Sequence, residues 1–350
     1  MRHYVRKRQR HIRRSLRNAA KDGEITLVLG AGVSIGRGVP SWSKLVRELW
    51  QELKPKREVP EWLAGKQAPP HPLAYQILLE EIEGATRSEI ALVKEVHADT
   101  IDPSVVRKAM VRKIRNKLYG SPQEPTDADT LSVLIALLQD EQRRADCRIV
   151  RVITFNADDL LERGTNEGKD MDTIVAYPIP RASYHPKYGP RAHGRRAIDV
   201  YHLHGFVPHK PYYNRGAEDT LVFTDAEYWE SVANPASFAN RVMQSALHLS
   251  NCVFIGMSMT DVNMMRWLGL RFDEFVRDRS AGYAYNGYTP ARAHAKTRQA
   301  ISRHYWICTV QDDPERFIAS HLERRGVQTY VLPEWGEPFK ALIEECFRRP

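Results

Sequence analysis

The chain has 350 residues, 42 % of them apolar and 27 % charged, and a net charge of +9, a composition that is ordinary for a soluble globular protein. No window approaches the roughly 18 uncharged apolar residues of a membrane span, and the charged start of the chain lacks the apolar core of a secretory signal. The four cysteines lie far apart, so we expect reduced thiols in a cytoplasmic protein, with neither a disulfide set nor a metal framework.

The N-terminus is strongly basic, because its first 17 residues hold eight Arg or Lys and no acid. We interpret residues 1–22 as a basic extension, which can bind nucleic acid or an acidic protein surface. A solvated helix and an arginine-rich contact between subunits are the alternatives, since no stacking aromatic pattern or DNA-binding motif accompanies the charge.

The next part of the chain predicts one strand followed by helices. The apolar run 25–29 ends in glycine, as a short buried strand does, and Ser41 can cap a helix at 42–53. Residues 55–72 are rich in Pro and charge and predict a loop. Helical spacing follows at 72–82, 103–120 and 127–144, the last capped by Asp127 or Asp129. Because this stretch is too long for an ordinary crossover, we interpret about 55–145 as an inserted helical lobe in a domain that spans 23–350.

From about residue 148, strands alternate with helices. Apolar runs predict strands at 147–156, 172–179, 197–205, 219–223, 251–261, 304–310 and 327–333. Helices are predicted between or after them at 158–166, 225–232 (capped by Thr224 or Asp225), 234–250, 262–279 and 338–349. Residues 181–197 predict a loop. The alternation predicts an α/β fold, a Rossmann-like doubly wound and mostly parallel sheet with helices on both faces and an inserted helical lobe.

The first predicted strand runs into Gly30-Ala31-Gly32. Such a turn suits backbone N–H groups that face a phosphate. The dinucleotide fingerprint, however, needs a third glycine where Ile35 stands, and the Gly-Lys-Ser/Thr of a Walker loop is absent. By itself the loop is equally compatible with a nucleotide site and with a tight structural turn.

Three further strands end in small polar or titratable residues, at 154–158, 202–205 and 256–261. The carboxyl ends of parallel strands form the ligand crevice of an α/β sheet. We therefore expect these three segments to converge with the glycine loop at one edge of the sheet.

These four stretches, in this order, resemble the sirtuin pattern. GAGVS, TFNAD, HLHG and GMS stand where sirtuins have GAGxS, TxNxD, a His-Gly pair and a late Gly-x-Ser, over about residues 25–335. GVPSW, LVFTDAEYW and GMSMTDVN resemble the bacterial sirtuin-like branch of anti-phage defence and not the deacylases. The sequence has no Cys-x-x-Cys pairs of the kind that hold zinc in many deacylases, so we expect no zinc module and no zinc.

The resemblance implies NAD as the substrate and its nicotinamide–ribose bond as the target. Asn156 would orient the nicotinamide ribose or the attacking water. His204, with an ordinary pKa near 6.5, would be the base. Asp158 would hold the carboxamide or a ribose hydroxyl. The other candidate NAD-binding residues are Gly30, Ala31, Gly32, Ser34, Trp42, Thr154, Gly256, Ser258 and Asp261.

Structural roles compete at several of these positions. His202 and His204 would share one face of a strand, so geometry alone admits either as the base, and the resemblance favours His204. Asn156 and Asp261 each precede a helix and can serve as its N-cap. Trp42 fits a core position better than base stacking.

With water as the acceptor, the implied reaction is hydrolysis of NAD to ADP-ribose and nicotinamide by an NAD-depleting effector of anti-phage defence. Such an effector must be restrained. The resemblance implies control by homo-oligomerisation or by a partner such as a HerA-type ATPase or an Argonaute-like protein. A protein deacylase or ADP-ribosyltransferase is one alternative, and a non-catalytic nucleotide-binding scaffold in a nucleic-acid-processing complex is the other.

Overall fold

The computed structural model describes most of the chain. The described residues are 2–53, 58, 60, 71–95, 97–144, 146–167, 176–180, 197–210, 221–222, 227–229, 233–285, 289, 304–313 and 317–347. Several predicted features lie wholly or mostly outside them: the 55–72 loop, the 181–197 loop, and the helix cap at Thr224 or Asp225. Of the predicted strand 219–223 only residues 221–222 are described, and they are not in a strand. Of the predicted helix 225–232 only residues 227–229 are described, and they are helical.

The seven described strands form one sheet, and every neighbouring pair is parallel. The strands are β1 (Ile25–Leu29), β2 (Ile149–Thr154), β3 (Ala176–Ile179), β4 (Ile198–His202), β5 (Asn251–Ile255), β6 (His304–Thr309) and β7 (Val327–Leu332). Their order across the sheet is β3-β4-β2-β1-β5-β6-β7. The Rossmann-like doubly wound α/β fold that the sequence predicts is confirmed.

The strand order locates the ligand crevice. β1 lies between β2 and β5, so the chain builds the sheet first toward one edge and later toward the other. In parallel α/β sheets, ligands bind outside the carboxyl ends of the strands at such a switch point. The residues that follow β1, β2, β4 and β5 therefore surround the expected crevice.

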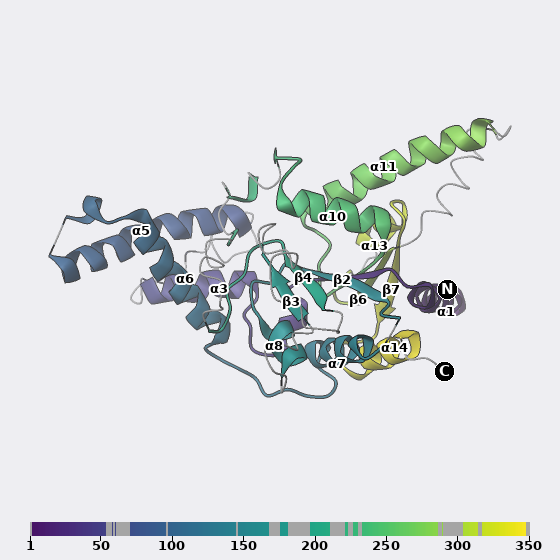
Figure 1. Ribbon diagram of the computed structural model, residues 1–350, viewed down its shortest axis with the longest axis horizontal. Helices are drawn as coiled ribbons and strands as arrows, with labels where there is room; N and C mark the ends of the chain where they lie inside the picture. The colour runs from purple at the N-terminus through teal and green to yellow at the C-terminus, as the bar shows by residue number, and fades with distance from the viewer. Residues whose placement is uncertain are drawn as a thin grey trace.

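Helices cover both faces of the sheet (Figure 1). One face packs against α1 (Arg2–Asp22), α7 (Thr130–Gln142), α8 (Leu160–Asn166) and α14 (Glu337–Phe347). The other face packs against α10 (Phe238–Leu249), α11 (Val262–Tyr285) and α13 (Phe317–Glu323). Leu27 and Leu29 of β1 are buried in the first cluster and Val28 in the second, because successive side chains of a strand point to opposite faces.

The basic N-terminal segment forms α1, and the inner face of this helix belongs to the core. Ile12 and Leu16 are buried among residues of the sheet and of α14. At the edge of this contact, Arg13 forms an ion pair with Glu345 of α14 at 2.9 Å. The helix is therefore packed on the sheet domain along its length and does not project from it.

The predicted insertion contains helices that belong to two different cores. Most of its helices share a cluster with α3 (Trp42–Leu53), which precedes the predicted insertion, and this cluster includes Leu45, Val106 and Met110. Figure 1 shows these helices gathered at the far side of the sheet from α1. Besides α3, they are α5 (His71–Lys94), the 3-10 helix η1 (Ala98–Thr100) and α6 (Pro103–Tyr119). α7 packs on the sheet instead, and Asp129 is its cap, since its Oδ1 accepts a hydrogen bond from Ser132 N at 2.9 Å.

The sequence pattern does not predict the short helices α13, η1 and the single turn α2 (Gly32–Ile35). All three are too short for a helical period to show. Among the described residues, no helix has the length and apolar character that crossing a bilayer requires.

Candidate active site

The glycine loop after β1 packs directly against the end of β5. A Cβ added to Gly30 would lie 2.5 Å from Gly256 O, and one added to Gly32 would lie 2.9 Å from the same atom. Gly256 has a φ of +66°, and its own Cβ would lie 2.7 Å from Val33 N. Backbone atoms leave no room to adjust, so glycine is required at these three positions by the close approach of two backbones.

Amide groups of this loop are already used to hold it in place. Gly32 N donates to Gly256 O at 3.0 Å, Val33 N to Gly30 O at 3.1 Å and Ser34 N to Ala31 O at 3.1 Å. These amide hydrogens are committed to the protein itself. The loop therefore contributes to the site mainly through the side chain of Ser34, which is buried beside the end of β2.

Ser34 joins two of the residues that follow β2. Asn156 Nδ2 donates to Ser34 Oγ at 3.1 Å, and Ser34 Oγ donates to Asp158 Oδ1 at 3.3 Å. The backbone of Asn156 is held in turn by Thr154, whose Oγ1 accepts from Asn156 N at 3.0 Å. The structure thus brings Ser34, Thr154, Asn156 and Asp158 together, as the sequence predicts.

One atom in this group stands out electrostatically. Asn156 Oδ1 is buried and has no hydrogen-bond partner among the described residues. An unpaired buried amide oxygen costs free energy, about 1–3 kcal/mol, and most such atoms in proteins are paired. Asn156 does not cap α8 either, because Asp158 Oδ1 accepts from Leu160 N at 3.2 Å. The amide oxygen of Asn156 is therefore available to a donor group of a ligand.

Carboxylates crowd the same region. Burial raises the pKa of Asp158 to about 6, although hydrogen bonds from Leu160 N and Ser34 oppose the shift. The nearby charges of Asp159 and Glu162 raise this pKa further. Burial also raises the pKa of Asp159. Burial thus disfavours the ionised forms of these carboxyls, and a cationic group bound beside them would favour their ionisation.

His202 is enclosed in this acidic region. Its Nε2 lies 2.6 Å from Glu162 Oε1 of α8, and its Nδ1 lies 2.9 Å from the carbonyl oxygen of Asn156. Burial alone would lower the pKa of His202, but the carboxylate of Glu162 outweighs it and the pKa is raised. An imidazole with both nitrogens occupied holds the backbone of Asn156 in place and is not free to accept a proton from a substrate.

His204 has different neighbours. β4 ends at His202, and the chain turns through His204 to Gly205, which has a φ of +88°. The ring of His204 packs edge-on against Phe155, with centroids 5.0 Å apart, and lies 6.3 Å from the ring of Tyr228. The two histidines therefore do not share a face, because the strand ends between them.

The protonation of His204 suits a base. Burial lowers its pKa, and the carboxylate of Asp261 partly offsets this. A lowered pKa keeps the imidazole neutral at pH 7, the form that accepts a proton. His202, by contrast, has a raised pKa and a partner on each ring nitrogen.

Asp261 has a structural role in the free protein. Its Oδ1 accepts from Met264 N at 2.9 Å, which caps the start of α11, and its Oδ2 accepts from Tyr228 OH at 2.9 Å. Ser258, by contrast, is exposed, and its hydroxyl lies 2.8 Å from Thr260 Oγ1. These contacts place Asp261 beside His204 and leave Ser258 at the open rim of the β5 end.

A small cavity connects the glycine loop with the helical lobe. Its lining includes Ala31, Asn156 and Asp158 from the strand ends and Trp42 from α3. Trp42 also packs against the core of the lobe, so it serves as core residue and site wall at once. The cavity measures about 20 Å³, which is far smaller than a dinucleotide.

Side chains of α6 in the lobe form hydrogen bonds with the segment that follows His204, a feature that the sequence did not predict. Tyr119 OH lies 2.7 Å from Val207 O and 3.0 Å from Asp159 Oδ1. Arg107 donates to Leu221 O and to Glu227 Oε1, both at 2.8 Å. The polar residues of α6 belong to no recognisable sequence motif, so the sequence offered no reason to include them. The acidic residues Asp158, Asp159 and Glu162, at helical spacing, were the only feature of the sequence that could have added residues to the predicted site.

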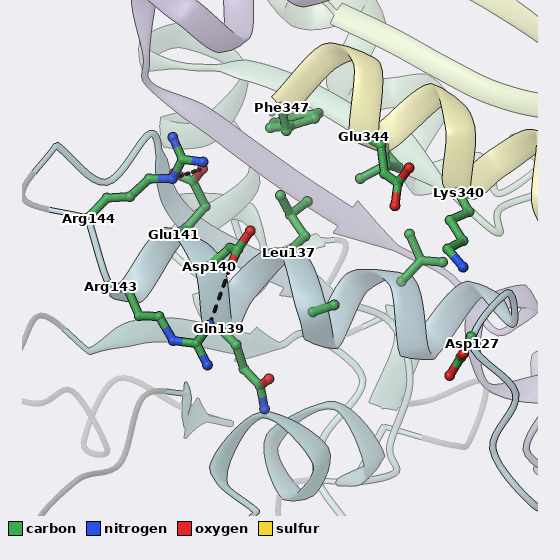
Figure 2. Close-up of a pocket in the computed structure, with 13 residues that line it drawn as sticks. Asp127, Leu137, Gln139, Asp140, Glu141, Arg143, Arg144, Lys340, Glu344 and Phe347 are labelled. Carbon is green, nitrogen blue, oxygen red and sulfur yellow. Dashed lines mark hydrogen bonds and ion pairs between the residues drawn. The ribbon is translucent and has the colours of Figure 1, made fainter. Parts of the chain in front are cut away.

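A larger cavity of about 250 Å³ lies elsewhere, between α7 and α14 (Figure 2). Leu137 and Phe347 face each other across it, and charged side chains such as Arg143 and Lys340 stand around it. None of the sequence-predicted catalytic or NAD-binding residues lines this cavity. In the described part of the chain, no group of three or more His, Cys, Asp or Glu side chains is arranged to hold a metal ion.

Comparison with known proteins connects this geometry with one family. A protein-family model described as a SIR2-like domain matches residues 150–312. The matched segment begins within β2 and extends past β6, so it includes Asn156, Asp158 and His204. A search of curated proteins found no match. Over these residues the chain is similar to SIR2-like domains, and this similarity supports a sirtuin-like fold with an NAD-related activity.

Proposed function

We propose that the protein hydrolyses NAD at the nicotinamide–ribose bond and releases nicotinamide and ADP-ribose. The observation that carries the proposal is the unpaired, buried amide oxygen of Asn156 within the SIR2-like match. It lies beside the carboxylate of Asp158 and near the end of the strand that leads to His204. Sirtuin-like chemistry requires an asparagine at this position, and here its oxygen has no structural duty.

The arrangement suits departure of a cationic leaving group. As nicotinamide leaves, the ribose becomes oxocarbenium-like and positively charged, and negative charge nearby stabilises it. Asp158, with a pKa of about 6, is mostly ionised at neutral pH. Asn156 Oδ1 would accept a hydrogen bond from the attacking water or from a ribose hydroxyl.

His204 would complete the hydrolysis as general base. The neutral imidazole accepts one proton from the attacking water as the new C–O bond forms, and it later returns that proton to solvent. The other histidine, His202, is a positioning residue, because its contacts with Glu162 and with the carbonyl of Asn156 hold the Asn156 backbone.

The biological role that we propose for the protein rests on the sequence resemblance. We propose a cytoplasmic NAD-depleting effector of anti-phage defence, controlled by homo-oligomerisation or by a HerA-type ATPase or Argonaute-like partner. The supporting observation in the structure is the set of hydrogen bonds from α6 side chains to the segment after His204. A partner that displaces the lobe would act on the catalytic segment through these contacts.

The test is to incubate the purified chain with NAD, alone and with a candidate partner, and to quantify nicotinamide and ADP-ribose by chromatography. Asn156→Ala and His204→Ala should both abolish release. Asn116→Ala and His248→Ala, at exposed positions of α6 and α10, are the matched controls and should cleave NAD normally.

Two outcomes would replace the proposal. Release of nicotinamide only when an acceptor protein is added, with ADP-ribose or an acyl group on that protein's side of the reaction, would indicate a transferase or deacylase. Tight binding of NAD in a calorimeter without release under any condition would indicate a non-catalytic scaffold.

A further inference from the structure

The outer face of α1 is a continuous basic stripe. Lys7, Arg10, Arg14 and Lys21 are exposed, and their spacing of three, four and seven residues places them on one side of the helix. The opposite side is the buried one that includes Leu16. At about 1.5 Å per residue, the stripe is about 21 Å long.

Two groups of basic residues on α1 differ in their partners. Arg8 and Arg13, beside the buried face, form ion pairs with Glu323 and Glu345. The four stripe residues form no ion pair within the part of the chain that the structure describes. Compensation of charge inside the protein is thus confined to the inner side of the helix, and the outer side is left as a row of uncompensated cations.

Between residues 7 and 22, the rest of the exposed face contains no apolar anchor. Its other exposed positions there are His11, Asn18 and Asp22. Peripheral membrane helices insert an apolar face into the lipid, and the apolar face of α1 is already buried in the core. Protein interfaces rely on aromatic and apolar residues at their centre, and none is exposed on this stretch.

A polyanion with regularly spaced charges needs only cations for binding. Nucleic acid provides such a polyanion, and contacts of Lys and Arg with phosphates supply nearly all of its sequence-independent affinity. We propose that the outer face of α1 binds the sugar–phosphate backbone of nucleic acid without reading its sequence. α1 lies across the sheet domain from the helical lobe (Figure 1), so bound nucleic acid would leave the lobe's side of the candidate active site uncovered.

The experiment measures binding of a fluorescent duplex DNA and of a single-stranded RNA by anisotropy, at about 50 and about 200 mM salt. The stripe variant is Lys7→Gln, Arg10→Gln, Arg14→Gln and Lys21→Gln. The expected result is a loss of affinity of at least about tenfold at the lower salt. Each phosphate contact contributes about 0.9 to the slope of log affinity against log salt for duplex DNA, so the slope should fall by about 3 to 4.

The matched control removes the same charge from the opposite side of the molecule. Arg47→Gln, Lys94→Gln, Lys108→Gln and Arg112→Gln are exposed positions on the lobe, and this variant should bind nucleic acid like the unaltered chain. All eight positions are exposed, so both variants should fold, which circular dichroism and the thermal midpoint check.

Three results would overturn the proposal. One is absence of binding by the unaltered folded chain to either nucleic acid at about 50 mM salt. Another is an equal loss in the stripe and lobe variants, which would indicate diffuse attraction by net charge. The third is stripe-dependent binding of polyglutamate or of phosphatidylserine vesicles that is tighter than that of DNA and RNA, which would indicate an acidic protein surface or a membrane instead.

Discussion

The two histidines at the end of β4 lie two residues apart and have opposite environments. His202 is enclosed by the Glu162 carboxylate and the Asn156 carbonyl, and its pKa is raised. His204 lies against the rings of Phe155 and Tyr228, and burial lowers its pKa. Two histidines so close in sequence differ in this way because the strand ends between them, so that one ring faces α8 and the other faces aromatic rings.

Removal of Glu162 should have the largest effect on stability, because it removes the carboxylate that encloses His202. Glu162→Ala leaves a buried imidazole without its partner, and loss of one member of a buried pair costs about 3–5 kcal/mol. Urea unfolding measures the loss. A loss below about 1 kcal/mol would contradict a structural role for the pair.

The same variant has a predicted pH dependence. The pKa of His202 is raised above its ordinary value of 6.5 in the folded protein. Stabilisation from the pair is therefore fully present below about pH 6.5 and is lost as pH rises through the folded pKa. The difference in stability between the unaltered chain and Glu162→Ala should be larger at about pH 6 than at about pH 9. Glu162→Gln, which keeps a hydrogen-bonding oxygen, should be the milder change.

Asp158→Asn, in the same buried region as His202, should raise the stability of the protein and lower its activity. Folding raises the pKa of this carboxyl from 3.8 to about 6, so ionisation of Asp158 costs stability, and the cost is complete above about pH 6. At about 1.4 kcal/mol per pKa unit, the variant should gain on the order of 3 kcal/mol of stability at about pH 8. It should also lose NAD cleavage. Equal stability of the two proteins at this pH would count against the burial of an ionised Asp158.

The pH profile of NAD cleavage tests the environment of His204. Cleavage should decline as pH falls below about 6, because Asp158, with a pKa of about 6, must be ionised and His204 must be neutral. Asp261 partly offsets the lowered pKa of His204, so Asp261→Asn should move part of the acid limb to lower pH. Its amide oxygen can still accept from Met264 N, which keeps the cap of α11. An unchanged limb would remove His204 from the role of base.

The smallest expected effect concerns the ring that borders His204. Tyr228→Phe removes the hydrogen bond to Asp261 and should cost about 1 kcal/mol of stability, as thermal unfolding can measure.

Gly84→Ala is a useful reference in the lobe. A Cβ there meets nothing within 4 Å, so this change should stabilise α5 by about 0.5–1 kcal/mol.

The local patterns of the chain were sufficient for much of the fold. β1, β5, β6 and β7 are apolar runs that end in turns, and α10 and α14 show a helical period, so hydrophobic spacing alone predicts them. The convergence of Ser34, Asn156 and Asp158 also follows from local information, because the ends of neighbouring parallel strands must meet at one edge.

Only the tertiary structure decided which histidine is enclosed. Alternation along a strand predicts a shared face for His202 and His204, but that rule holds only while the strand continues, and β4 ends at His202. The partner of His202 comes from α8, and the clamp on the segment after His204 comes from α6.

The basic N-terminus shows the same division. Composition alone determines that it is cationic, while the packing of Leu16 against the sheet selects which of its charges face solvent. The physical reason is common to both cases. Spacing and composition act over a few residues, whereas burial, pKa and charge pairing depend on side chains that lie far apart in the sequence and meet only in the fold.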